Sequence, residues 1–405
     1  MVTPSNPGRE HRVDFLRGAA LLIIFINHIP GNALSHLTPV NYGFSDAAEI
    51  FVTLAGFAAA QAYFPTFARG ERFAATLKSW RRAWLLYLCH IASTIACVAI
   101  LAAAAIIFAK PGYLADTIEP LYVDIAPLFT EPARGYIGIA TLGHQLGYFN
   151  ILPMYMVLLL AMPAIMALAL HGMVPLLTAS VALWIAAGVF AIDFPNYPTH
   201  GGWYFNPFAW QVLLVGGFAL GLAWRQHLSI KLPAWLVAIA VGYVILAAIV
   251  RTQELWAYFP ALPLPPLIWG FEKGYVALPR LLHGMALLVI LMGTPLWALL
   301  KKIPPGSPFH AMGRNALAVF CWGSILCLVA TVARFEIGGG IILDLVIVAA
   351  HFAIVAGLAM VLDRVRDHRP VKSIEPSATR KDGSTAPQLD PMPQNALQEV
   401  RIRGG

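Results

Sequence analysis

The sequence predicts an all-α polytopic membrane protein with about ten transmembrane helices. Hydrophobic residues make up 59% of its 405 residues and charged residues only 12%, whereas a soluble chain carries about 25% charged residues. The mean hydropathy is +0.70. The chain also contains repeated apolar runs of roughly the length that a bilayer core of about 30 Å requires. Together these observations exclude an ordinary soluble domain.

Ten apolar runs are candidate spans, each bounded by polar, proline or glycine residues. The first run follows basic residues, as a signal peptide would, but it contains His28 and lacks a convincing small-residue cleavage site. We therefore expect it to remain as the first helix. The runs extend over Leu16–Ile29, Ile50–Phe67, Ala83–Ala109, Gly147–Leu170, Val174–Ile192, Pro207–Trp224, Pro233–Val250, Val276–Leu300, Ala316–Ala333 and Ile341–Leu362.

The distribution of basic residues predicts that both termini are cytoplasmic. A net charge of +7 could indicate a nucleic-acid partner. With ten spans and a cytoplasmic amino terminus, however, most Lys and Arg residues fall on the inner side, as the positive-inside rule requires. This pattern explains the charge without a nucleic acid. The basic residues expected outside are Lys110, Arg134, Arg251, Lys273, Arg280 and Arg334.

The composition divides the chain into two parts. Residues 1–363 hold the apolar runs and are expected to form the transmembrane domain. Residues 364–405 are polar, with Pro, Ser, Gln and mixed charge, and are predicted to be a disordered cytoplasmic tail. The four cysteines all lie inside apolar runs without metal-ligand spacing, so we expect neither a disulfide framework nor a metal site.

The first run carries two ionisable residues on one helical face. Arg17 and His28 are close to three turns apart, so on a helix their side chains point the same way, about 16 Å apart. Ionisable groups within a membrane are costly and are candidates for function. A cation could hold an anionic group while the imidazole acts deeper in the membrane. Alternatively, the arginine snorkels to the headgroups and the histidine bonds a neighbouring helix.

A second cluster opens the next run. Asp46 and Glu49, which we call the acidic pair, are three residues apart and share a face if they lie on a helix. Helix capping by Ser45 or Asp46 is one explanation for this pair. Glu49 lies at the edge of the apolar run, where it could pair with His28 and orient its ring. Gly56 would permit close approach of another helix.

The motifs in the first two apolar runs resemble those of a known family. Arg17 and His28 match the Arg/Lys-x10-His motif of the membrane-bound acyltransferase family 3, and Glu49 to Phe57 resembles that family's acidic-x-Phe to Gly-Phe stretch. Ala55 stands where broader members often have Ser, so no nucleophile is expected there. Four segments resemble the OpgC branch more closely: Ile26–Asn32, Phe44–Glu49, Phe205–Gln211 and Arg280–His283.

The resemblance, which covers Asp14 to about Asp363, implies an enzyme of the bacterial inner membrane. Such an enzyme transfers an acyl group from cytoplasmic acyl-CoA to a hydroxyl of a glycan outside the cytoplasm. The OpgC branch includes enzymes that succinylate osmoregulated periplasmic glucans. Succinyl-CoA is therefore the expected donor substrate, a periplasmic glucan is the expected acceptor, and no tightly bound cofactor is expected.

The resemblance also suggests roles for the candidate residues. His28 would act as a general base or would carry the acyl group transiently. The acidic pair would hold the useful tautomer of its ring. Arg17, together with Arg81 and Arg82 of the second inner loop, would bind the CoA phosphates. The two loop arginines fit a role in topology at least as well.

Two further groups are candidates for binding the acyl group or the glycan. Arg280 and His283 are one turn apart and could hold an acyl carboxylate, although Arg280 could equally pair with an acidic loop residue such as Glu272. The second group consists of Asn206, Trp210 and Gln211. These side chains could bind sugar hydroxyls, although Asn206 is also a good helix cap.

Three rival functions remain open on the sequence. One is acetyl transfer to another cell-envelope polysaccharide. A second is a proton-coupled transporter, in which His28, Glu49 and Arg280 form a path for an anionic solute. A third is a non-catalytic membrane scaffold, which the ionisable residues on the first two helices disfavour. A transporter would move its substrate without releasing CoA.

Overall fold

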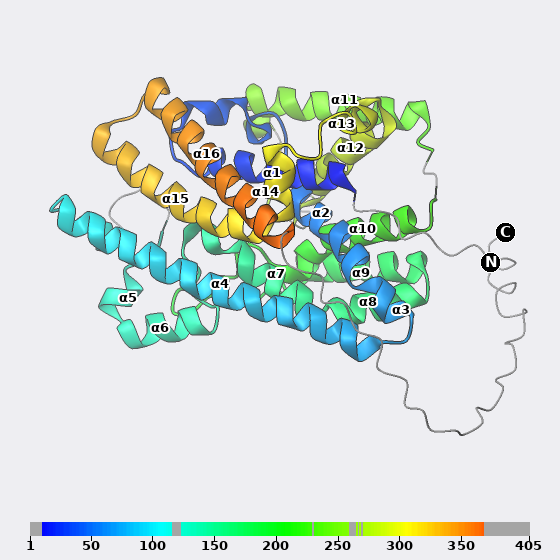
Figure 1. Ribbon diagram of the computed structural model, residues 1–405, viewed down its shortest axis with the longest axis horizontal. Helices are drawn as coiled ribbons and strands as arrows, with labels where there is room; N and C mark the ends of the chain where they lie inside the picture. Colours follow the sequence, from blue (N-terminus) through cyan, green and yellow to red (C-terminus); the bar gives the residue numbers. More distant parts are fainter. Residues whose placement is uncertain are drawn as a thin grey trace, which may run out of the picture. The chain divides into compact units, whose positions relative to one another are not determined.

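The computed structural model describes residues 10–115, 123–228, 231–258 and 270–367, together with residues 265, 267 and 268. The only β pairing in these residues is an isolated bridge between Pro195 and Gly202, so the all-α prediction is confirmed for this part of the chain. Figure 1 shows the helices α1 (His11–Asn27), α2 (Ala47–Ala62), α3 (Phe64–Ala68), α4 (Arg72–Ile107), α5 (Pro127–Thr130), α6 (Pro132–Ala140), α7 (Ile151–Leu160), α8 (Met162–Leu170), α9 (Met173–Val189), α10 (Pro207–Arg225), α11 (Ala234–Thr252), α12 (Leu278–Gly293), α13 (Leu296–Leu300), α14 (Pro308–Arg314), α15 (Ala316–Ile337) and α16 (Ile341–Asp367).

Five helices of the described residues are long and apolar enough to cross a membrane, namely α4, α10, α11, α15 and α16. Helices α7 and α8 give a sixth candidate if the pair, bent by 45°, counts as one span. Helices α2, α9 and α12 are apolar but shorter. All ten predicted runs fall on helices, yet five or six qualify as spans, so the expected count of about ten is not confirmed. The tail was predicted over residues 364–405: residues 364–367 continue α16, and the rest lies outside the described residues.

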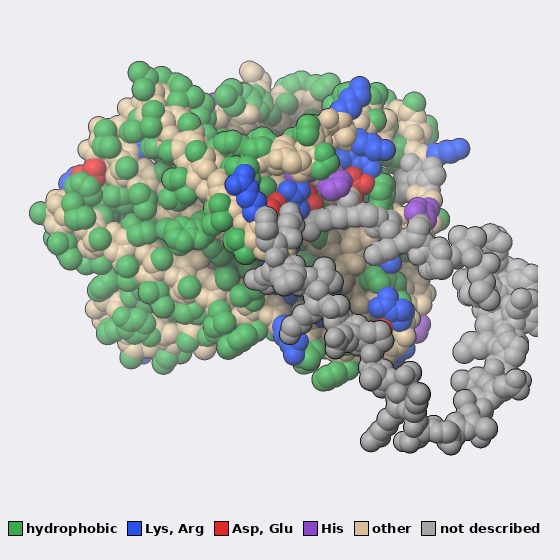
Figure 2. All heavy atoms as spheres, viewed as in Figure 1, with side chains coloured by type: hydrophobic (Ala, Val, Ile, Leu, Met, Phe, Trp, Pro, Cys, Tyr) green, Lys and Arg blue, Asp and Glu red, His purple; other side chains and the backbone are tan. Residues whose placement is uncertain are grey.

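The surface of the helical region is apolar over large areas. Figure 2 shows hydrophobic side chains spread over α4, α15 and α16, while charged side chains gather beside α1. Only 17% of the apolar window of α11 and 22% of that of α16 are buried, so most of their side chains point outward. Soluble monomers rarely expose contiguous apolar surface on this scale. These faces suit contact with lipid tails.

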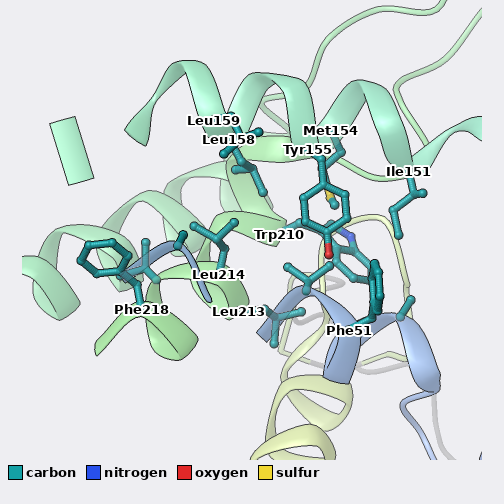
Figure 3. Close-up of a cluster of buried hydrophobic side chains, with 14 of the residues drawn as sticks. Phe51, Ile151, Met154, Tyr155, Leu158, Leu159, Trp210, Leu213, Leu214 and Phe218 are labelled. Carbon is teal, nitrogen blue, oxygen red and sulfur yellow. The ribbon is translucent and has the colours of Figure 1, made fainter. Parts of the chain in front are cut away.

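The core beside the candidate site joins α2, α7 and α10. Figure 3 shows Phe51 of α2 facing Tyr155 of α7, with Trp210 of α10 next to them. The rings of Phe51 and Tyr155 meet edge to face, with centroids 6.1 Å apart. Trp210 is fully buried, and its indole N–H donates to the Lys273 carbonyl oxygen at 3.1 Å. These large side chains fix the three helices against one another.

Helices α2 and α10 approach closely because glycines face the partner's backbone. A Cβ added to Gly56 would collide with the carbonyl oxygen of Leu214, and one added to Gly217 would collide with that of Thr53. The expectation that Gly56 permits close helix approach is thus confirmed. This contact holds the middle of α2 against α10, one to two turns after the acidic pair.

Replacing Gly217 by leucine is expected to force α2 and α10 apart and to lower thermal stability. Overpacking of this kind costs about 1–3 kcal/mol or more. The loss can be measured by heating the detergent-purified protein and following the folded fraction by size-exclusion chromatography. Gly216→Leu is the matched control, because a Cβ at Gly216 would meet nothing within 4 Å. Equal thermal stability of the two variants would contradict this account of the contact.

Candidate functional site

His28 lies at the carboxyl end of α1, where the chain leaves the helix. It is the C-cap residue, and its backbone N–H donates to the carbonyl oxygens of Ile24 and Phe25 at 3.1 and 3.2 Å. Pro30 and Gly31 follow, and Gly31 has a φ of +71°, so the helix does not continue. The sequence placed His28 within an apolar run, whereas the structure places it at the end of the helix.

His28 is half-buried at the end of α1. It packs against Tyr148, with ring centroids 4.1 Å apart at an angle of 31°. In the described part of the chain, no hydrogen bond reaches its ring nitrogens. Asp46 and Lys273 lie within electrostatic reach of the ring. An imidazole in this environment can exchange a proton with a bound hydroxyl.

The turn that follows His28 is clamped by an ion pair between α15 and α16. Arg334 donates to the carbonyl oxygens of Pro30 and Gly31, and its Nε lies 2.7 Å from Asp344 Oδ1. Asp344 Oδ2 accepts a hydrogen bond from the backbone N–H of Ala33 at 2.9 Å. Asp344 is almost fully buried. The clamp therefore holds the backbone beside His28 in one position.

The acidic pair forms a capping box at the start of α2. The Asp46 side chain accepts a hydrogen bond from the backbone N–H of Ala48 at 2.8 Å, and the Glu49 side chain accepts one from the backbone N–H of Asp46 at 2.9 Å. These bonds satisfy donors that the first helical turn leaves open. The capping explanation from the sequence is therefore confirmed.

Two cations from distant parts of the chain neutralise the acidic pair. Lys273 Nζ lies 2.6 Å from Asp46 Oδ2, and Arg280 Nε donates to Glu49 Oε1 at 2.9 Å. Glu49 is only 1% exposed. Burial alone would raise the pKa of Asp46, but Lys273 and Arg280 outweigh it and hold that pKa below its ordinary value. We call these four residues the charge cluster.

The expected contact between the acidic pair and His28 is absent from the described residues. The carboxylates of Asp46 and Glu49 are occupied by backbone N–H groups and by the two cations. Buried carboxylates need close counter-charges, and Lys273 and Arg280 supply them. These partners are 227 and 231 residues away in sequence, and no local spacing reveals them.

Arg280 and His283 lie together at the start of α12, and both side chains contact other protein groups, although His283 Nε2 is buried without a hydrogen-bond partner among the described residues. Arg280 pairs with Glu49, and not with Glu272 as one alternative suggested. His283 Nδ1 lies 2.7 Å from the hydroxyl of Ser45. Binding an acyl carboxylate to Arg280 would thus require competition with a buried ion pair.

The residues expected to contact sugar hydroxyls serve the packing of α10. Asn206 caps the helix by accepting from the N–H of Phe208 at 2.9 Å, and it is fully buried. Trp210 bonds a backbone carbonyl, as described above. Gln211 Oε1 accepts a hydrogen bond from the Ser180 hydroxyl at 2.7 Å. The cap that the sequence offered as an alternative for Asn206 is confirmed.

Arg17 and Arg82 line a common cavity of about 210 Å³ between α1, α2, α4, α7, α10 and α15. Its other walls are mainly apolar, and four alanines of α2 make room along one side. Arg81 is exposed and does not line this cavity. We call the cavity lined by Arg17 and Arg82 the Arg17 cavity. Its lining is Arg17, Phe51, Ala55, Ala58, Ala59, Ala62, Tyr63, Arg82, Leu86, Ile151, Leu152, Tyr155, Leu159, Leu214, Ala316, Leu317 and Phe320.

A second, much smaller cavity of about 10 Å³ lies beside His28. Its walls come from α1, α15 and α16 and include Cys327 and His351. Phe320 borders both this space and the Arg17 cavity. Phe320 of α15 is thus a wall shared by the cavity that holds the arginines and the space beside the imidazole. Phe320 and Tyr148 carry no sequence signal that marks them as site residues.

The family model described as OpgC protein matches residues 9–367. A search of curated proteins returns no match. The matched segment includes α1, α2 and α12. It therefore covers both the Arg17 cavity and His28. A match to this family points to an OpgC-type glucan modification by a membrane-associated transferase. On the strength of a match that covers most of its length, the chain belongs to the OpgC family.

Proposed function

We propose that this chain is an integral membrane O-acyltransferase of the bacterial inner membrane. It would transfer an acyl group, preferably succinyl, from cytoplasmic acyl-CoA to a hydroxyl of a periplasmic glucan. The observation that carries the proposal is the arrangement along α1. Arg17 lines a cavity at one level of the helix, His28 ends the helix, and Phe320 alone borders both spaces.

The Arg17 cavity offers a place for the acyl donor. Arg17 and Arg82 provide two cations for phosphate groups, which arginine binds well through its planar guanidinium. Arg17 and His28 are about 16 Å apart along the helix axis at a rise of about 1.5 Å per residue. The extended pantetheine arm of CoA spans a distance of this order. A phosphate at Arg17 would thus bring the thioester toward His28.

At His28 the proposed reaction is acyl transfer with general base catalysis. A ring nitrogen takes the proton of a glucan hydroxyl while the hydroxyl oxygen attacks the thioester carbonyl carbon. The carbon–sulfur bond then breaks, an oxygen ester forms, and the CoA thiolate leaves and recovers the proton from the imidazolium. Base catalysis of this kind is worth about 10²–10⁴ in rate.

Thiol release by the reconstituted protein tests the proposal. The purified protein in proteoliposomes is supplied with succinyl-CoA and a periplasmic glucan, and free CoA is measured with a thiol reagent. We expect CoA release that depends on the glucan and exceeds that with acetyl-CoA. Faster turnover with acetyl-CoA would replace succinyl by acetyl as the acyl group. Uptake of succinate into the vesicles without CoA release would overturn the enzyme in favour of the transporter.

A further inference from the structure

Tyr155 is a buried residue whose hydroxyl has no hydrogen-bond partner among the described residues. It lies on α7, and the residue is 9% exposed. A tyrosine hydroxyl in an interior usually finds a partner, because an unsatisfied one costs free energy. Packing of the ring against Phe51 explains why an aromatic residue stands here. It does not explain the hydroxyl, which phenylalanine would lack.

The hydroxyl borders the Arg17 cavity. Tyr155, Arg17 and Phe51 all line this cavity. In Figure 3 the Tyr155 ring points away from α7, and its oxygen is directed toward Phe51 and α2. The guanidinium carbon of Arg17 lies 5.8 Å from the centroid of the same Phe51 ring. Arg17 is also within electrostatic reach of the Tyr155 hydroxyl. A cation and an O–H donor therefore approach one space from two helices.

This pair of groups is complementary to an oxyanion. A guanidinium donates charge-assisted hydrogen bonds, and a phenol hydroxyl can add one more to the same anionic oxygen. Besides Arg17 and Tyr155, only Tyr63 and Arg82 of the described lining residues carry polar side chains, and the other walls are apolar. An oxyanion bound there would satisfy the hydroxyl that the chain itself leaves unsatisfied.

We propose that Tyr155 is a positioning residue that donates a hydrogen bond to an oxyanion of the acyl donor held beside Arg17. The inference rests on the proposed function, which supplies the donor. Two oxyanions of that donor share the required chemistry, a phosphate of CoA and the terminal carboxylate of a succinyl group. The alignment of Arg17 with His28 favours the phosphate. In either case Tyr155 fixes how far along the cavity the donor sits.

Binding of CoA and of succinyl-CoA to Tyr155→Phe tests the inference. The affinities are measured by calorimetry on detergent-purified protein, without any acceptor. Loss of a hydrogen bond to an anion should weaken binding about ten- to hundredfold. Thermal stability of the empty protein should stay the same or rise, because the substitution removes an unsatisfied hydroxyl. In turnover, KM for the donor should rise while kcat stays near the wild-type value.

Tyr243→Phe is the matched control. The hydroxyl of Tyr243 donates to the carbonyl oxygen of Pro279 at 3.0 Å, and this residue does not line the Arg17 cavity. Its loss should lower thermal stability and leave the donor affinity unchanged. The two tyrosines thus give opposite patterns if one hydroxyl serves a ligand and the other serves the fold.

The affinities of Tyr155→Phe for CoA and succinyl-CoA distinguish a phosphate contact from a carboxylate contact and from no contact. Weaker binding of both CoA and succinyl-CoA to Tyr155→Phe would support a phosphate contact, and weaker binding of succinyl-CoA alone would support a carboxylate contact. Unchanged affinity for both would overturn the inference. If the wild-type protein binds CoA with a Tyr155-dependent affinity but transfers no acyl group, the proposed function fails and the binding site stands. If it binds neither ligand, both fail.

Discussion

Replacing His28 by alanine is expected to reduce acyl transfer to background while leaving folded protein in the membrane. The imidazole is the proposed base, and its loss removes about 10²–10⁴ in rate. Folding should survive, because the half-buried ring makes no hydrogen bond with the described residues and contacts chiefly Tyr148. Glutamine at this position should be equally inactive, since it cannot take up the proton. Both variants are measured by CoA release in proteoliposomes and by size-exclusion chromatography.

His36→Gln is the matched control for this prediction. His36 lies in the short 3-10 helix Ala33–Leu37 and is exposed. It is not part of either cavity, so we expect wild-type turnover. Substantial turnover of His28→Ala, at a level near that of His36→Gln, would remove His28 from the reaction and with it the proposed mechanism.

Replacing Arg280 by methionine is expected to cause the largest loss of stability of any substitution discussed here. The substitution leaves Glu49, which is 1% exposed, without its main counter-charge. Removal of one partner from a buried ion pair costs about 3–5 kcal/mol. The double variant Glu49→Gln with Arg280→Met should recover part of the loss, because it removes the uncompensated carboxylate as well. Thermal unfolding in detergent measures both variants against the wild type.

Arg134→Met provides the comparison at an exposed ion pair. Arg134 lies 2.9 Å from Glu131, but the two side chains are 65% and 54% exposed. Such surface pairs are worth about 0–1 kcal/mol. If Arg280→Met were as mild as Arg134→Met, the charge cluster would not hold α12 against α2. If the double variant were less stable than Arg280→Met alone, the uncompensated carboxylate would not be the cause of the loss.

The sequence predicted the helices well because their signal is local. Every apolar run falls on one or two helices, and Gly56 allows close approach of another helix, as expected. Span number was harder to predict, since it depends on where helices bend or end. His28 illustrates this: the apolar run continues to Ile29, but the helix ends at Asn27 and the chain turns at Gly31.

The site could be predicted only in part. Arg17 and His28 lie on one helix, so their spacing in the sequence carries over to the structure. The acidic pair was found, but its partners were not, because Lys273 and Arg280 reach it from more than 220 residues away. Tyr155 and Phe320 gave no signal either. Both look like ordinary core aromatics until the helices around the Arg17 cavity are assembled.

The most direct test of the central claim is mass spectrometry of periplasmic glucans from three strains. These are the wild type, a deletion strain, and the deletion strain complemented with His28→Ala. We predict glucans with a succinyl mass increment in the wild type and unmodified glucans in the other two. Identical glucans in all three strains would contradict the claim that this chain acylates a periplasmic glucan through His28.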